Sequence, residues 1–551
     1  MEKILKVVIN NEKNVKVDYK SKVIDVLHSN NEDLSNVLAV KVNNEVRSLN
    51  TVLYKNSNIE YIFFDNEDGY RIYSRTAKFI LYMALTRLYK DVEIEFISTI
   101  NKDQFFIAKD FDLTEEKIKE IKLEMLNIIN KDMKIEKKVV PIEEARILYT
   151  ESNDVSKLKN LDNKIKSYAS MYFCDGLYNY LYGMLAPSTG LIKSFDLIKY
   201  KDGAMIIIPD SLDEGMDFKK DIKETRLYNT FISYNELNQI LKVENVGNLN
   251  LATLEGRVNK VIQSAEAIHQ RNIVEIVQKI EKKQTVKMIL IAGPSSSGKT
   301  TFAQKLGIDL TLIGLNPITI SMDNYFVERK DTPLGEDGKF DFERVDALDI
   351  ELFNSHMNSL INGEEIHMPE FNFFEGKKEY KGKFLKLKPN DVLIIEGIHA
   401  LNPILTKFAT DDKKFRIYIA PIATLNIDNY TKVSSTDIRL LRRMIRDNVT
   451  RGHNPEKTFE LWKNVKKGEE KYIFPHMEEV DEVFNSSLVY EAGILKTFAQ
   501  PLLLQVDTSS VYYSEARRLY EFLNNFLPIE TTAVPTDSII REFIGSGCFY
   551  R

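Results

Sequence analysis

The sequence predicts three folded modules, the last of which is built on a mainly parallel α/β sheet. From Val286 onward, short apolar runs such as MILIA and DVLII alternate with helical segments, as in sheets that have helices on both faces. Before residue 65, apolar and polar residues alternate with the period of half-buried strands, which indicates a small β-grasp-like module. Between the two, helical and strand patterns mix, and we expect an α+β module there.

Changes of pattern divide the chain into five predicted segments. A β-grasp-like module, an α+β module, a helical linker, a parallel α/β module and a tail are expected in this order: 1–65, 66–225, 226–285, 286–525 and 526–551. In the first segment, the pairs Asn10-Asn11 and Asn43-Asn44 suit tight turns between strands. In the fourth, strands are expected at five apolar runs, VKMILIAG, NPITISMD, NDVLIIEG, FRIYIA and PLLLQVD.

Composition excludes several classes of protein. Charged residues make up 28% and hydrophobic residues 43%, so the chain is not wholly disordered. With 75 Lys+Arg against 81 Asp+Glu, the net charge of −6 does not favour a nucleic-acid or membrane partner. The two cysteines, Cys174 and Cys548, are too few and too far apart for a disulfide framework or a thiolate metal site. No apolar stretch approaches the ~18 residues of a membrane span, and no signal peptide is evident, so we expect a cytoplasmic protein.

A complete phosphate-binding motif opens the fourth segment. The stretch Gly293-Pro294-Ser295-Ser296-Ser297-Gly298-Lys299-Thr300 matches G-x-x-x-x-G-K-[ST] between an apolar run and a helical pattern. Its glycines let the loop curl so that backbone N–H groups point inward, and the helix that follows adds positive potential. Lys299 is suited to the β- and γ-phosphates, and Thr300 to Mg²⁺. We therefore predict that 293–301, with Thr301 as its last member, bind ATP or GTP; a plain glycine turn is the alternative.

Two carboxylates are expected at the same edge of this sheet. Glu396 ends the strand DVLIIE and is placed to hold Mg²⁺ directly or through water. Asp323, in SMDNYF, follows the strand-like run 317–320. A carboxylate there can accept the proton of an attacking hydroxyl; GTPases and ATPases activate water instead, so Asp323 favours a kinase. The alternative is an ordinary acid at a strand end or in a turn.

Arginines gather after residue 438. Arg439, Arg442, Arg443 and Arg446 share one helix face at i, i+3, i+4 and i+7, and Arg451 follows. Arginine on a lid suits the charge spread over a transferring phosphoryl group. The alternative is a polar helix face that only carries charge for solvation.

Several stretches together resemble the uridine kinase and phosphoribulokinase family of P-loop kinases over 286–525. They are GPSSSGKTTFA, SMDNYF, FDFERVDALD, DVLIIEGIHAL and RLLRRMIRDNVTRG. The resemblance implies a mainly parallel α/β sheet with a lid, and transfer of the γ-phosphoryl group of ATP or GTP to a sugar hydroxyl, typically the ribose 5′-OH. It implies Asp323 as the base, acting with Lys299, and Thr300 and Glu396 as Mg²⁺ ligands. Around substrate and phosphates it places Arg443, Arg446 and Arg451.

The residues that read the acceptor depart from that pattern. Glu343 stands where uridine kinases carry an Asp that grips the ribose diol, and Phe371-Asn372-Phe373 replaces a Tyr-Asp-Phe segment. Glu375-Gly376 follows in place of a base-reading His, and His453 replaces a lid Arg. The predicted substrate contacts are Asp323, Tyr325, Glu343, Phe371, Phe373 and Arg443. We expect a nucleoside or related sugar as the acceptor, with its base, if it has one, not read as uracil is.

The front half resembles part of another family. Residues 1–65 resemble the TGS domain of threonyl-tRNA synthetases, and 68–225 resemble the α+β domain that follows it there. In the synthetase that second domain carries an H-x-x-x-H editing pair on its first helix. Ser74 and Lys78 stand at the matching positions here, so we expect no hydrolytic editing. Fusion of such domains to a uridine-kinase-like domain is found in bacteria, and the tail VPTDSIIREFIGSGCFY resembles the ending of such fusions.

Three functions stay open at this point. The leading one is an ATP-dependent nucleoside or sugar kinase. A phosphoribulokinase-like kinase of another small metabolite shares its chemistry. The third is an RNA- or ribosome-associated regulatory protein that uses the P-loop module as a nucleotide switch. Such a switch needs no base, and the front half lacks the basic, aromatic-rich run that RNA binding favours. The acceptor, the formation of a homo-oligomer and the role of the front half are not determined by the sequence.

Overall fold

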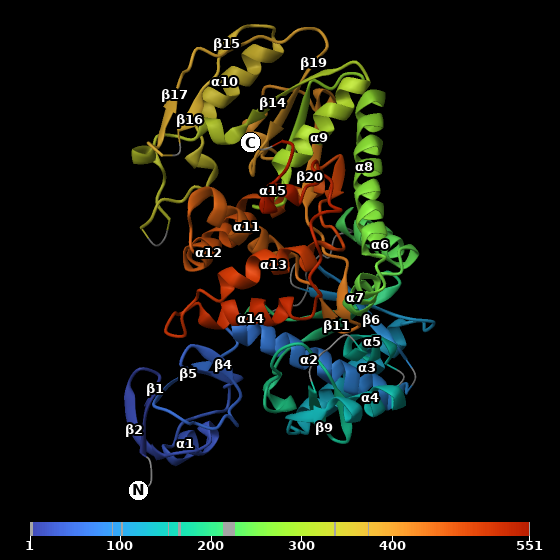
Figure 1. Ribbon diagram of the computed structural model, residues 1–551, viewed down its shortest axis with the longest axis vertical. Coiled ribbons are helices and arrows are strands. Elements are labelled where there is room, and N and C mark those ends of the chain that lie inside the picture. Colours follow the sequence, from blue (N-terminus) through green and yellow to red (C-terminus); the bar gives the residue numbers. More distant parts are fainter. Residues whose placement is uncertain are drawn as a thin grey trace.

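The computed structural model describes residues 4–90, 92–100, 103–152, 154–162, 167–212, 226–335, 338–372 and 374–549. The first sheet lies at one end of the molecule, and the parallel sheet of the P-loop module lies at the other (Figure 1). Within these ranges no helix is both long and apolar enough to cross a membrane.

A mixed five-stranded sheet opens the chain, in the order β2-β1-β5-β3-β4. Strands β1 and β5 are parallel, and the other pairs are antiparallel. The hairpin between β3 and β4 turns at Asn43 and Asn44, whose φ angles of 51° and 63° confirm the predicted asparagine turn. The elements are β1 (Ile4–Ile9), β2 (Lys13–Asp18), α1 (Val23–Ser29), β3 (Ala39–Val42), β4 (Glu45–Arg47) and β5 (Ser57–Ile62). The TGS identity of this unit stays a prediction.

Two antiparallel sheets surround a long buried helix in the next part of the chain. The helix is α2 (Glu67–Leu88), and the sheets have the orders β11-β12-β7-β6 and β10-β9-β8. The predicted hairpins of the aromatic stretch are confirmed as β9–β10 and β11–β12. The strands are β6 (Ile94–Ile100), β7 (Asp103–Ala108), β8 (Glu136–Pro141), β9 (Tyr168–Cys174), β10 (Leu177–Asn179), β11 (Asp196–Tyr200) and β12 (Gly203–Ile207). The further helices are α3 (Glu115–Asn130), α4 (Ile142–Glu151) and α5 (Val155–Asp162).

The P-loop module contains the predicted parallel sheet, in the order β14-β19-β13-β20-β23. Alternate residues of β13 face opposite cores. Met288 and Leu290 pack with the helix α10 (Ile350–Ile361), whereas Ile289 and Ile291 pack against α8 (Val258–Lys282) and α9 (Lys299–Leu312). The strands are β13 (Met288–Ala292), β14 (Asn316–Ser321), β19 (Asp391–Glu396), β20 (Lys414–Ala420) and β23 (Glu482–Asn485).

The predicted fifth strand, PLLLQVD, was placed wrongly. Leu502 and Leu503 belong to the end of α13 (Glu491–Leu503), and the fifth strand is β23, EVFN. A short apolar run has no period that separates a strand from a buried helix turn. Here the leucines pack into a helical core instead of pairing with β20.

That helical core joins helices that precede the strands of the parallel sheet in the sequence with helices that come later in the chain. The helix α7 (Val246–Leu254) and the first half of α8 pack with α11 (Ser435–Arg451), α13 and α14 (Tyr513–Leu523). The segment predicted as a linker is therefore packed against the P-loop module. The remaining helices are α6 (Arg226–Ile240), α12 (Pro455–Tyr472) and α15 (Arg541–Ile544), and small hairpins are formed by β15 (Ile366–His367) with β18 (Phe384–Leu385), β16 (Glu370–Asn372) with β17 (Lys377–Glu379), and β21 (Asn426–Asp428) with β22 (Thr431–Lys432).

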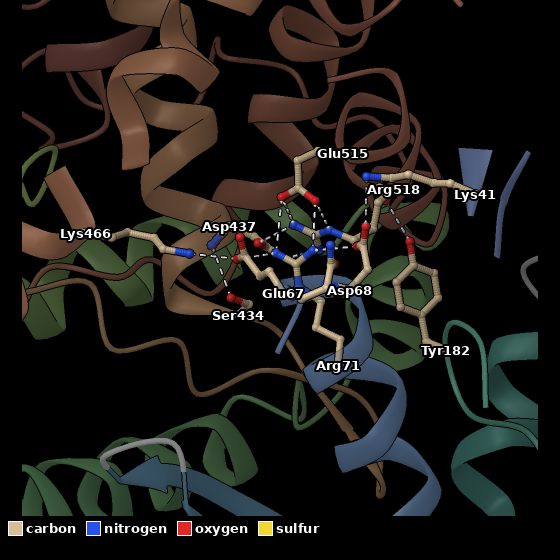
Figure 2. Close-up of polar contacts among 11 residues, drawn as sticks. Lys41, Glu67, Asp68, Arg71, Tyr182, Ser434, Asp437, Lys466, Glu515 and Arg518 are labelled. Carbon is tan, nitrogen blue, oxygen red and sulfur yellow. Dashed lines mark hydrogen bonds and ion pairs between the residues drawn. The ribbon is translucent and has the colours of Figure 1, made fainter. Parts of the chain in front are cut away.

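Ion pairs connect α2 with α12 and α14, and Arg518 of α14 extends this network to α11, the helix that carries the arginine stripe (Figure 2). Arg71 of α2 lies 2.9 Å from Glu515 of α14, and Arg518 of α14 makes two 2.7 Å hydrogen bonds to Asp437 in the first turn of α11. Burial disfavours the charged form of Arg518, but Asp437 and Glu515 outweigh it and raise its pKa. Lys466 of α12 also contacts α2, at Glu67. The start of α11 is thus fixed with respect to α2.

Candidate active site

The phosphate-binding motif forms the loop between β13 and α9, as its context predicts. Gly298 ends the loop with a left-handed φ of 88°, a conformation that glycine adopts without strain. A side chain at Gly293 would place its Cβ 1.9 Å from the carbonyl oxygen of Ile419 on β20. Both glycines are therefore required by the local geometry. Among the described residues, the buried hydroxyls of Ser296 and Ser297 have no hydrogen-bond partner, which suits an anion in the loop.

Helix α11 holds this loop from the outside. Arg439 donates to the carbonyl oxygen of Ser295 over 2.9 Å, and Arg443 donates to the Ser295 hydroxyl over 2.9 Å. Arg442 is fully buried and pairs with Glu491. The arginine stripe is therefore a set of contacts to the loop, and the alternative of a merely solvated face does not apply to these three side chains.

The last two arginines lie farther out. Arg446 and Arg451 both pair with Asp447, at 2.9 and 3.6 Å, and the Arg451 side chain is 51% exposed. Burial raises the pKa of Asp323, and the positive charges of Arg446 and Arg451 oppose that shift. They thus add positive charge near Asp323, whereas Arg439, Arg442 and Arg443 contact the loop.

Asp323 and Glu396 meet at the predicted sheet edge. Ser321, at the end of β14, pairs in register with Glu396, which also pairs with Ile291 just before the loop. Burial and the nearby Asp323 carboxylate raise the pKa of Glu396 to about 7, while Lys299 opposes that shift. Solvent reaches Asp323, but partial desolvation by the surrounding protein raises its pKa, and Lys299, Arg451 and Arg446 oppose the shift. The two acids and Lys299 therefore form one electrostatic cluster.

Lys299 turns toward the loop itself. Its Nζ donates to the carbonyl oxygens of Gly293 and Pro294 at 3.0 and 3.2 Å. Burial lowers the pKa of Lys299, and the carboxylates Glu396, Glu542 and Asp323 counteract this effect. The lysine is therefore held within reach of both acids.

The donor set fits a magnesium ion that is completed by water and phosphate. Thr300 lies in the first turn of α9 and Glu396 at the adjacent strand end, and both offer hard oxygen atoms. The raised pKa of Glu396 marks a buried negative charge that a cation would compensate. No cluster of three or more His, Cys, Asp or Glu side chains in the described ranges could hold a metal alone. Mg²⁺ commonly binds in this way, through one or two protein ligands.

Glu343, which the sequence predicts to contact the phosphate acceptor, lies near Arg443 and Lys299. Burial raises the pKa of Glu343 to about 7; Arg443 and Lys299 oppose the shift, and Glu469 and Asp341 add to it. Gly468 of α12 lies directly against it, since a Cβ there would be 2.5 Å from the Cβ of Glu343.

The aromatic residues predicted to contact substrate are not gathered at the phosphate loop. Tyr325 is fully buried, and its hydroxyl lies 3.2 Å from Nδ1 of His356. Phe371 is also buried and packs edge-on against Phe326, with ring centroids 5.7 Å apart. Phe373 lies outside the described residues. In this conformation Tyr325 is a core residue.

Two acids at the site were missed by the sequence analysis. Glu469 of α12 is 2% exposed, accepts a hydrogen bond from the Ser295 N–H and pairs with Arg439. Its position on the apolar helix face with Trp462 and Val465 could have revealed it, because a buried acid requires a partner. Glu542, in the tail, contacts Thr301, and no local pattern in the sequence indicates that contact.

Ser74 and Lys78, the residues that the resemblance predicts to stand at the synthetase editing positions, both have polar partners. Lys78 is buried, and its Nζ donates to the carbonyl oxygen of Tyr430 at 3.3 Å, in the hairpin between β21 and β22. Burial lowers the pKa of Lys78 to about 7. Ser74 accepts a 2.7 Å hydrogen bond from Gln104. A segment from the P-loop half of the chain thus occupies the space next to these side chains.

Comparisons with known proteins agree with this geometry for one part of the chain. Residues 288–490 match the model of the Phosphoribulokinase / Uridine kinase family. A uridine kinase of Halobacterium salinarum is 29% identical over 192 residues, which are 35% of this chain and 76% of that protein. A uridine kinase of Borrelia garinii subsp. bavariensis is 29% identical over 222 residues, which are 39% of this chain and 95% of that protein.

The solved structures add little. That of a possible uridine kinase from Bacillus stearothermophilus covers 38% of this chain and 98% of its own, at 18% identity and a TM-score of 0.27. The family match leaves residues 1–287 unassigned. Within the chain, residues 288–490 form a domain of the phosphoribulokinase/uridine kinase family.

Proposed function

We propose that the protein is a kinase that transfers the γ-phosphoryl group of ATP or GTP to a hydroxyl of a nucleoside or a related sugar. One observation carries the proposal. A P-loop lysine, a strand-end glutamate and an aspartate that solvent can reach share one electrostatic cluster, in which burial raises the pKa of Glu396 and of Asp323 and the positive charge of Lys299 opposes both shifts. A nucleotide switch has no use for the aspartate, whereas a kinase needs a proton acceptor there.

Each group then has a role in transfer. Asp323 takes the proton of the acceptor hydroxyl while that oxygen bonds to the γ-phosphorus and the bond to the β-phosphate oxygen breaks. In this proposal Lys299 and Arg443 carry positive charge to the transferring group, and Arg446 and Arg451 add positive charge beside Asp323. Thr300 and Glu396 would hold Mg²⁺, which neutralises charge between the β- and γ-phosphates when it is bound.

The acceptor that we propose is a ribose-like polyol. Glu343 offers two carboxylate oxygens to a vicinal diol, and Arg443 beside it compensates its charge. The name of the relatives described above, uridine kinase, supports a nucleoside as the acceptor. Buried Tyr325 and Phe371, however, offer no polar group for a pyrimidine edge in this conformation. Broad tolerance of the base, or a smaller sugar acceptor, is therefore expected.

A screen of phosphate acceptors tests the proposal. The full-length protein is assayed by coupled release of the nucleoside diphosphate with ATP and with GTP, across uridine, cytidine, adenosine, inosine, ribose and pentose phosphates, and the product is identified by mass spectrometry. Turnover with at least one ribose-like acceptor, lost in Lys299→Ala, supports it. Turnover with none of them, in a folded protein, argues against it. A preference for uridine above about 10³-fold would contradict the expected tolerance and leave the kinase intact.

A further inference from the structure

The C-terminal tail crosses the start of α9, beside the phosphate loop. Ile539 packs so closely on the loop that a Cβ at Gly298 would lie 2.4 Å from its Cγ2. Ile539 and Phe543 are buried in the core that Phe302 of α9 belongs to. Phe543 also lies under the guanidinium of Arg442, 5.0 Å from the ring centroid. The tail is thus part of the wall around the loop.

Several contacts anchor the backbone of this segment. Asp537 pairs with Lys305 of α9 at 2.6 Å, and the Ser538 hydroxyl donates to Glu266 of α8 at 2.5 Å. Arg541 closes the tail on itself through the carbonyl oxygens of Thr531 and Val534, at 2.9 and 2.8 Å. These contacts fix the main chain before Glu542, and the buried Phe543 fixes it on the other side, whereas the side chain of Glu542 itself is only partly buried.

Glu542 reaches from this anchored segment to the first turn of α9. One of its carboxylate oxygens accepts hydrogen bonds from the hydroxyl of Thr301 at 2.9 Å and from the Thr301 N–H at 3.4 Å. Thr301 is the third residue of α9, and the N–H groups of the first turn of a helix point out of its N-terminal end. In a P-loop, N–H groups of this turn are the ones that bind the phosphates of a nucleotide.

The charge of Glu542 is also felt inside the site. Its negative charge counteracts the lowering of the pKa of Lys299 that burial causes and adds to the raised pKa of Glu396, so its carboxylate lies near both groups. A carboxylate and a phosphate cannot accept the same N–H and would repel each other at that distance.

We propose that the C-terminal tail is part of the nucleotide site, and that Glu542 occupies a phosphate position at Thr301 that a nucleotide must take from it. The inference rests on the proposed function, and it adds a residue that sets the affinity for phosphate. When a nucleotide binds, the side chain of Glu542 changes its rotamer and leaves Thr301, while the tail backbone stays in place because the contacts described above anchor it. The competing interpretation is that Glu542 only caps α9, in which case its removal lowers stability without raising phosphate affinity.

Binding measurements on the full-length protein separate the two interpretations. ADP and inorganic pyrophosphate are titrated calorimetrically into wild type, Glu542→Gln, Glu542→Lys and the control Glu530→Gln, which removes an exposed tail charge of the same kind. We expect Glu542→Gln to bind both probes roughly tenfold more tightly, because a neutral amide competes less well than a carboxylate and does not repel phosphate. Glu542→Lys should bind them more tightly still, and Glu530→Gln should match wild type.

Other binding results would contradict the inference about Glu542, the proposed function, or both. Unchanged or weaker binding in Glu542→Gln and Glu542→Lys, with the melting temperature of each variant recorded, overturns the inference. If wild type binds both probes and Lys299→Ala does not, the nucleotide site stands whatever Glu542 does. If Lys299→Ala binds as wild type does, or no variant binds either probe, the proposed function fails and the inference fails with it.

Discussion

Arg442 is the side chain whose replacement we expect to destabilise the P-loop module most. Its side chain has no exposed surface, and its Nε donates to Glu491 at 2.8 Å. It also donates to the carbonyl oxygens of Ser486 at 2.9 Å and of Ser296, in the loop, at 3.4 Å. Methionine would fill a similar volume and remove every one of these donors.

The magnitude follows from what Arg442→Met leaves behind. Glu491, whose side chain is 3% exposed, would keep only its hydrogen bonds from the Ser487 hydroxyl and the Leu488 N–H. Removing one partner of a buried ion pair costs about 3–5 kcal/mol, because the other charge stays buried without compensation. Replacing both partners with apolar side chains is often nearly neutral, so Arg442→Met with Glu491→Leu should recover most of the loss.

A local probe measures this in a chain of several modules. The single tryptophan, Trp462 of α12, is buried in the same core as α11. Urea unfolding followed by its fluorescence therefore reports on this module. Arg451→Met is the matched control: it lies on the same helix, its side chain is 51% exposed, and its partner Asp447 keeps Arg443 and Arg446, so the substitution should cost about 1 kcal/mol or less. A loss below about 1 kcal/mol for Arg442→Met, or no recovery in the double variant, would refute the reasoning.

Four further outcomes are expected. Lys299→Ala should abolish phosphoryl transfer in the coupled assay, and normal turnover by the folded variant would contradict the ATP site. Asp323→Asn should lower kcat by roughly 10²–10⁴-fold with nucleotide affinity kept, whereas a change confined to KM for ATP would place the base elsewhere. Burial raises the pKa of Glu343 to about 7, although Arg443 opposes the shift, so KM for the acceptor should fall as the pH rises through about 7 and Glu343 ionises. Glu343→Gln should flatten this pH profile of KM. If the variant keeps the wild-type profile, Glu343 is not the group that titrates. The protein should not deacylate mischarged tRNA, since the buried Lys78 stands where the resemblance to the synthetase predicts a metal-binding histidine; zinc-dependent hydrolysis would overturn this.

Features that depend on neighbouring residues could be predicted from the sequence. The P-loop follows from the spacing of two glycines, a lysine and a threonine between a strand and a helix. The asparagine turn at Asn43 and Asn44 follows from the tolerance of that side chain for positive φ. The parallel sheet follows from apolar runs separated by helices, and its edge explains why Glu396 lies beside the loop.

Features that depend on contacts distant in the sequence were decided by the tertiary structure alone. The short apolar run PLLL fits both a strand and the end of a helix, and only its packing in the helical core made it a helix end. The arginines of α11 look like a charged surface in the sequence, and only packing against the loop and against Glu469 and Glu491 buries three of them. Glu542 lies 241 residues from Thr301, and no local pattern encodes their contact. The sequence by itself predicted which groups bind phosphate, since that chemistry lies in one short loop; the fold decided which acids and bases surround the loop, since burial and charge pairing arise only when distant segments meet.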